Sequence, residues 1–143
     1  MEKPFIIENA RERNRLKALV DRISDEQLAR TFSNGWTVAT ALAHLAFWDY
    51  RSSLALNKIK AGATAAAPGD IDTINDALLP LCLAIPPRAA ATLALSAAEM
   101  VDGDLETVSD EVIAAVERLG ERFRLYRSVH RKMHLDEIAA LLG

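Results

Sequence analysis

The chain contains three histidines, and their spacing is its clearest chemical signal. His130 and His134 are four residues apart, so on an α-helix both rings share one face, about 6 Å apart along the axis. His44 lies beside Leu45 and Trp48 in another segment with helical apolar periodicity. Buried imidazole nitrogens need partners, and one divalent metal ion would supply a partner to all three rings. Three protein ligands with an open fourth position are typical of a catalytic zinc site.

The same histidines have a second interpretation. Partly buried histidines also occur as ordinary core residues with their own hydrogen-bond partners. The spacing of His130 and His134 does not by itself bring His44 to them. Both interpretations stay open at this point, and they differ in whether the three rings meet.

Charged residues near the histidines in sequence are candidates for supporting roles. Asp49, Asp136 and Glu137 each offer a carboxylate that can accept the ring N–H of a metal-binding histidine. Arg127 and Arg131 lie within one helical turn of the first histidine of the pair, where they can hold a carboxylate of an anionic substrate. The alternative for all five is a solvated charge on the protein surface.

The remaining candidates are aromatic, thiol and amide side chains. We expect Trp36 and Trp48 to be core residues or pocket walls. Cys82 keeps helical spacing with its apolar neighbours, which indicates a buried, unreactive thiol. Asn75 lies near the start of the third helical segment and is a further candidate to face a cleft.

Apolar periodicity and helix-start residues predict the elements that must position these side chains. Ala and Leu dominate, and no alternating strand pattern of useful length is present. Pro80 predicts a kink, Pro86–Pro87 predict a break, and 61–70 is expected to be a loop. We predict four long helical segments, over 5–23, 37–60 with Thr37 as the cap, 72 to about 100 with a break at Pro86–Pro87 after which helix resumes at Pro87, and 121–142, with short helices after Ser24 and from Ser109 to Gly120.

The last predicted helix carries the histidine pair. We expect its inward stripe to consist of Phe123, Tyr126, His130, Met133, His134, Ile138 and Leu141. Four long helical segments in 143 residues predict an all-α four-helix bundle with extra short helices. This length favours a single domain over residues 1–143. The long connections leave the order of helix directions open.

Charge and apolar content exclude several classes of protein. The chain has 17 Lys+Arg, 20 Asp+Glu, a net charge of −3 and 50% hydrophobic residues. This excludes a disordered chain and offers no basic excess for nucleic acid. Cys82 is the only cysteine, and the longest apolar stretch, 77–85, is broken by Pro80, so we expect neither a disulfide framework nor a membrane span. The N-terminus lacks a signal-peptide core, so we expect a cytoplasmic protein, and the apolar content predicts a homodimer.

Two segments resemble motifs of a known family. Gly-Trp-Thr-Val at 35–38, Leu-Ala-His-Leu at 42–45 and Trp48 resemble the second-helix signature of the DinB/YfiT-like metalloenzymes. His-Arg-Lys-Met-His-Leu-Asp-Glu-Ile at 130–138 resembles the closing His-x-x-x-His helix of that family. Chain length, helix order and the gap between the motifs also match, so the resemblance extends over essentially the whole chain.

The resemblance implies a four-helix bundle, typically dimeric, that binds nickel or zinc through three histidines. By position these are His44, His130 and His134. Relatives include thiol-dependent S-transferases and maleylpyruvate isomerases that use mycothiol or bacillithiol. The implied function is that of a metal-dependent transferase or isomerase with a small-molecule substrate and a low-molecular-weight thiol.

Two alternatives stay open on the sequence. A metal-bound water can hydrolyse an amide or ester, provided that a nearby carboxylate acts as general base. A non-catalytic stress protein can instead bind a metal ion or ligand without turning it over. A fourth protein ligand would favour the non-catalytic function, and an open position favours catalysis.

Overall fold

The computed structural model describes residues 2–63 and 69–143, which contain helices and, apart from one isolated bridge between Thr31 and Thr37, no β-structure. The predicted all-α class is therefore confirmed. The helices are α1 (Pro4–Arg22), α2 (Asp25–Leu28), α3 (Val38–Lys60), α4 (Ile71–Ala84), α5 (Pro87–Glu106), α6 (Asp110–Arg118), the 3-10 helix η1 (Arg122–Arg124) and α7 (Ser128–Leu142).

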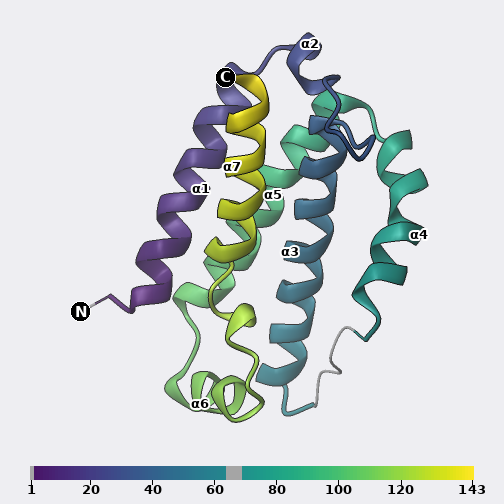
Figure 1. The fold of residues 1–143 in the computed structure, drawn as a ribbon. Helices are drawn as coiled ribbons and strands as arrows, with labels where there is room; N and C mark the ends of the chain where they lie inside the picture. The colour runs from purple at the N-terminus through teal and green to yellow at the C-terminus, as the bar shows by residue number, and fades with distance from the viewer. Residues whose placement is uncertain (1, 64–68) are drawn as a thin grey trace.

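Four long helices form the predicted bundle. Both α1 and α3 pack against α5 and α7, so the four helices enclose a common interior (Figure 1). In this view α1 and α7 run upward, whereas α3 and α5 run downward. The order of directions along the chain is up, down, down, up, because α4 returns the chain to the top of the bundle along the outside of α3.

Three predicted helix starts are confirmed by their capping hydrogen bonds. The Ser24 side chain accepts from the backbone N–H of Gln27, and the Gln27 side chain accepts from the backbone N–H of Ser24. Thr37 accepts from the N–H of Thr40 at the start of α3, and Ser109 caps α6 in the same way. These bonds satisfy N–H groups that have no partner inside the first helical turn.

The third predicted helical region divides into two helices. The helix α4 runs through Pro80, and the chain breaks at Pro86–Pro87 as predicted. The helix α5 then extends to Glu106, beyond the expected end near residue 100. Part of the loop expected over 61–70 falls on residues 64–68, which lie outside the described ranges.

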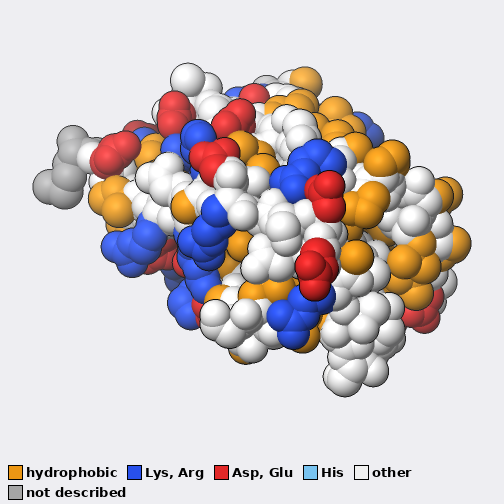
Figure 2. All heavy atoms as spheres, turned by 90° about the horizontal axis from the view of Figure 1, so that it is seen from above, with side chains coloured by type: hydrophobic (Ala, Val, Ile, Leu, Met, Phe, Trp, Pro, Cys, Tyr) orange, Lys and Arg blue, Asp and Glu red, His pale blue; other side chains and the backbone are white. Residues whose placement is uncertain are grey.

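The outer helix α4 buries little of its own surface. Cys82 is its single buried residue within the described part of the chain, whereas Leu81 and Leu83 are 66% and 54% exposed. Leu81 thus lies away from the packed side, although it keeps helical spacing with Leu78 and Ile85. Figure 2, seen from above, shows hydrophobic side chains gathered on the side where α4 lies and charged side chains gathered on the opposite side.

The last helix is shorter than predicted. It begins at Ser128 and not at Glu121, because residues 122–124 form the separate turn η1. A side chain from α1 fixes this start. Asn9 Nδ2 donates to the carbonyl of Leu125 at 2.8 Å, and Asn9 Oδ1 accepts from the N–H of Ser128 at 2.8 Å. A tertiary contact therefore serves as the cap of α7.

The later start corrects the predicted inward stripe. His134 and Ile138 are buried as expected, but Phe123 is 42% exposed and Met133 is 50% exposed. Phe123 lies in η1, which does not continue the phase of α7, and both exposed side chains line a pocket and not the core.

Two apolar clusters fill the bundle, and buried polar side chains occupy the level between them. One cluster contains Leu16 and Leu42, and the other contains Phe5 and Leu56. On α1 and α3 the polar positions Asn9 and Asp49 fall between the residues of the two clusters. This polar layer consists of Asn9, Asp49, Asp102, Arg127 and Arg131.

We expect Asn9→Ala to lower the free energy of unfolding by about 2 kcal/mol or more, because the Leu125 carbonyl and the Ser128 N–H lose their partner. Urea unfolding measures the change. The matched control is Asn57→Ala, at an exposed position of α3, where we expect a change within about 0.5 kcal/mol. Equal unfolding midpoints for the two variants would contradict the capping role of Asn9.

Candidate metal centre

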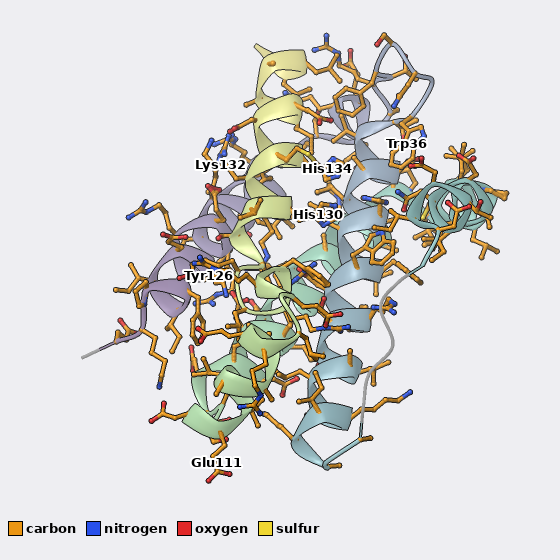
Figure 3. All side chains as sticks on the ribbon, turned by 60° about the horizontal axis from the view of Figure 1, so that its bottom comes forward. Trp36, Glu111, Tyr126, His130, Lys132 and His134 are labelled. Atoms are coloured by element: carbon orange, nitrogen blue, oxygen red, sulfur yellow. The ribbon has the colours of Figure 1, made fainter. Side chains whose placement is uncertain are left out.

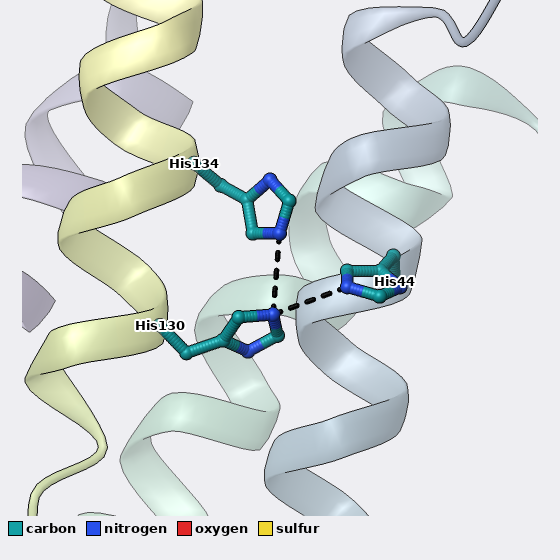
Figure 4. A group of neighbouring side chains, drawn as sticks. All are labelled: His44, His130 and His134. Carbon is teal, nitrogen blue, oxygen red and sulfur yellow. Dashed lines mark hydrogen bonds between the residues drawn. The ribbon is translucent and has the colours of Figure 1, made fainter. Parts of the chain in front are cut away.

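The three histidines converge in the interior between α3 and α7. His130 and His134 extend from successive turns of α7, and His44 extends toward them from α3 (Figures 3 and 4). The Nε2 atom of His130 lies 3.1 Å from Nε2 of His44 and 3.2 Å from Nε2 of His134. One ligand atom from each residue lies within 4.8 Å of the other two.

Protons alone cannot satisfy this arrangement of nitrogens. A neutral imidazole nitrogen has one in-plane position, which either donates or accepts a single hydrogen bond. Nε2 of His130 faces two other ring nitrogens, so it can pair with one of them only. In addition, Nδ1 of His44 and Nδ1 of His134 are buried without a hydrogen-bond partner among the described residues. A shared cation would satisfy all three Nε2 lone pairs.

The environment keeps these rings neutral. Burial is the main cause that lowers the pKa of His44 from 6.5 to about 4, with a smaller effect of His134. Burial also lowers the pKa of His130 to about 2, aided by the other two histidines and by Arg127 and Arg131. For His134 burial lowers the pKa, and Glu137 partly opposes it. Neutral rings leave their lone pairs available to a metal ion.

The geometry fits a tetrahedral metal ion. Nitrogens bound at about 2.0–2.1 Å in a tetrahedral site are about 3.3–3.4 Å apart. The two Nε2 separations from His130, 3.1 and 3.2 Å, are close to this value. Within residues 2–63 and 69–143, no other group of three His, Cys, Asp or Glu side chains meets in this way. The residues present therefore fit an ion with three protein ligands and a further open position.

A pocket of about 570 Å³ opens beside the histidines. Trp36 and Trp48 are among its walls, which agrees with one of the two expectations for these residues. Trp36 meets the His44 ring edge to face at 5.2 Å between centroids. Asn75, from α4, also lines the pocket, and its Oδ1 accepts from Nε1 of Trp48 at 3.0 Å. The pocket has room for a small molecule next to the ring nitrogens.

Of the three acidic candidates, only Glu137 lies at the histidines. Its carboxylate is 3.7 Å from Nδ1 of His134, and it lines the pocket. Asp136 instead pairs with Arg15 and Lys132 at the surface. Asp49 is buried, but its hydrogen bonds go to arginines and not to a histidine ring.

The two arginines are not the solvated surface charges that the alternative interpretation expected. Arg127 is 4% exposed and Arg131 is fully buried. Their Nε atoms donate to the two oxygens of Asp49, at 2.9 Å from Arg127 and 3.2 Å from Arg131. Arg131 also donates twice to Asp102, at 2.8 Å each, and Arg13 donates to the same carboxylate at 2.6 Å. A chain of ion pairs, buried except at Arg13, thus lies next to the histidines.

Sequence analysis missed two members of this layer. Asp102 lies four residues after Ala98 and three before Leu105, both buried, so it is a charge on an apolar helical stripe, and this pattern could have identified it. Asn9 has no such signal, since its partners are more than one hundred residues away in the sequence. Cys82 is buried as expected, and burial raises the pKa of its thiol.

Comparison with protein-family models identifies the family of this chain. A sequence model of the DinB superfamily matches residues 8–142. The chain belongs to the DinB superfamily. Comparisons with curated proteins and with solved structures gave no significant match. In the part of the chain that the structure describes, no helix of this DinB-superfamily protein combines the length and apolarity needed to cross a bilayer.

We predict that the metal-free protein loses stability between pH 7 and pH 5. The folded pKa values of His44 and His130 lie below the ordinary 6.5, so the unfolded chain takes up protons in this range and the folded chain does not. The free energy of unfolding therefore decreases as the pH is lowered from 7 to 5, whereas carboxylates titrate mostly below this range. Urea unfolding at several pH values in the presence of a chelator measures this decrease. His44→Gln should show a shallower dependence, and an equal slope in both proteins would contradict the cause given.

Proposed function

We propose that His44, His130 and His134 bind one divalent metal ion, zinc or nickel, through their Nε2 atoms. The observation that carries this proposal is the convergence of three neutral ring nitrogens that cannot all be paired by hydrogen bonds to one another. Membership of the DinB superfamily supports it independently. Imidazole suits both metals, so the choice between them rests on measurement.

We further propose that the protein is a thiol-dependent S-transferase or isomerase. A divalent ion lowers the pKa of a bound thiol and supplies a nucleophile at neutral pH. The chain's own residues supply the surroundings. Trp36 and Trp48 form apolar walls of the pocket beside His44, and the volume of about 570 Å³ accepts a small electrophile beside the thiol. A thiol cosubstrate and an unpaired Cys82 both fit a reducing compartment, so we place the protein in the cytoplasm.

One observation favours a second candidate, the hydrolysis of an amide or ester. Glu137 lines the pocket with a carboxylate that is about half exposed, in reach of a small substrate. Such a group can take the proton of an attacking water. A purely structural or storage site is less well supported, because no fourth protein ligand joins the three histidines within the described residues.

We also propose that the protein is a homodimer that pairs through α4. Leu81 is a large apolar side chain that is 66% exposed on this outer helix, and we take the side of α4 that carries it as the interface. A second copy related by a two-fold axis would remove this surface from water.

We expect His130→Ala to fold and to lose stoichiometric metal. Its metal affinity should fall by roughly 100-fold or more, because a direct ligand is removed. Losing only a hydrogen-bond partner of a metal ligand typically lowers the affinity by less. Elemental analysis after loading with zinc or nickel measures the metal, and circular dichroism measures the helix content. Activity is assayed as the consumption of glutathione, bacillithiol or mycothiol in the presence of a panel of small electrophiles and esters. We expect this consumption only with the metal-loaded wild-type protein.

The matched control is Met133→Ala, on the same helix and at the same pocket but without a ligand atom for the ion. It should keep stoichiometric metal. Full metal content in His130→Ala would remove His130 from the ligand set. Failure of His130→Ala to fold would instead identify the ion as structural. Activity on esters without any thiol would favour the hydrolase.

For the dimer, we expect Leu81→Lys to give a monomer at micromolar concentration, because a charge would be buried at the interface. Light scattering and analytical ultracentrifugation measure the mass. Val129→Lys, at a 68% exposed position of α7, is the control and should leave the dimer intact. A monomeric wild-type protein would refute the proposal.

A further inference from the structure

We propose that Arg127 forms a subsite that binds a carboxylate group of the small molecule in the pocket. This inference names the substrate class for the proposed function, and it concerns a residue that does not contact the proposed ion. It predicts a substrate with one carboxylate attached to an apolar or aromatic body.

The first argument is the unused hydrogen-bonding capacity of Arg127. Its Nε donates to Asp49, and its Nη1 donates to the carbonyl of Phe123 at 2.9 Å. A guanidinium has five N–H groups, so Nη2 and one hydrogen of Nη1 are left without a partner among the described residues. Arg127 also lines the pocket while being only 4% exposed. A nearly buried cation with free donors beside a pocket is suited to a bidentate carboxylate.

The second argument is the charge balance of the buried ion pairs. The chain of contacts joins three guanidinium groups, those of Arg13, Arg127 and Arg131, to the two carboxylates of Asp49 and Asp102. One positive charge is therefore in excess. Arg131 uses all three nitrogens within the protein, so the excess is available at the two ends of the chain of contacts. Arg127 is the end that lies at the pocket, and one carboxylate would balance it.

The third argument is the position of Arg127 relative to the histidines. It precedes His130 by three residues, which corresponds to about 4.5 Å along the axis of α7. Glu137 lies at the opposite end of the same wall, beyond His134. The wall thus has a cation at one end, neutral rings in the middle and a carboxylate at the other end. A bound carboxylate would be attracted to the Arg127 end, and the apolar body would lie against the aromatic walls near the histidines.

The test compares 3-phenylpropionate with 3-phenylpropionamide, which differ in charge and little in shape. Binding is followed by two-dimensional NMR on the full chain without metal, so the result does not depend on the proposed ion. We expect the acid to bind at least roughly tenfold more tightly than the amide, which corresponds to a charge-assisted hydrogen-bonded pair. The largest shifts should fall on residues 123–130 and on Trp48.

Arg127→Gln should reduce the affinity for the acid to that for the amide. The control is Lys132→Gln, which removes one positive charge from the same helix; Lys132 is exposed and points away from the histidines (Figure 3). It should keep the preference for the acid. Arg127→Lys keeps the charge but not the forked geometry, and should bind the acid with intermediate affinity.

Several results would overturn the subsite. They are equal binding of acid and amide by the wild-type chain, shifts that cluster away from 123–130, or an unchanged preference for the acid in Arg127→Gln. If Arg127→Gln does not fold, the wild-type comparison and Arg127→Lys decide. Binding of the acid only after zinc is added would refute the Arg127 subsite and leave the metal site supported. Failure of zinc to bind, with the preference for the acid intact, would refute the proposed function and retain the subsite.

Discussion

The geometry of the site depends on one buried carboxylate, that of Asp49. It lies on α3, five residues after His44, and accepts hydrogen bonds from Arg127, directly before α7, and from Arg131 on α7. These arginines flank His130 on either side in the sequence. A buried charge that loses its partner costs several kcal/mol, so α7 cannot slide or rotate against α3 without a large penalty. The ion pairs thus fix the register that brings His130 to His44.

The same polar layer joins all four helices of the bundle. Asp102 connects α5 to Arg131 on α7 and to Arg13 on α1, and Asn9 connects α1 to the start of α7. Apolar clusters above and below the layer supply most of the burial that drives folding, but apolar contacts tolerate small displacements. Hydrogen-bonded ions do not, so we infer that the layer sets the precise arrangement while the clusters supply stability.

The sequence predicted what local periodicity controls. The helix class, the caps at Ser24, Thr37 and Ser109, and the convergence of the histidines follow from spacing within single segments and from the family resemblance. The start of α7 could not be predicted, because its cap is Asn9, a side chain from the far end of the chain. The position of α4 outside the bundle depends on competition between helices for one core and not on its own pattern.

The two arginines show most clearly what the sequence could not predict. Arg127 and Arg131 are of a residue type and at positions that are typical of the surface of a terminal helix, and only Asp49 and Asp102, from two other helices, make their burial possible. A pattern within one helix cannot reveal a charge that is compensated from elsewhere.

Positive charge close to the histidines has two opposite effects. Arg127 and Arg131 help to lower the pKa of His130, which keeps its ring neutral and able to bind a metal ion. The same charges repel a divalent cation. The two buried carboxylates cancel all but one of the three guanidinium charges, so both the repulsion of the ion and the electrostatic effect on the ring are reduced, and burial remains the main cause of the lowered pKa of His130. An ion bound at the histidines would add two positive charges to this excess of one. With the proposed ion bound, a pocket with this balance would attract thiolates and carboxylates, and Glu137 at its far end would limit how much negative charge a ligand can carry.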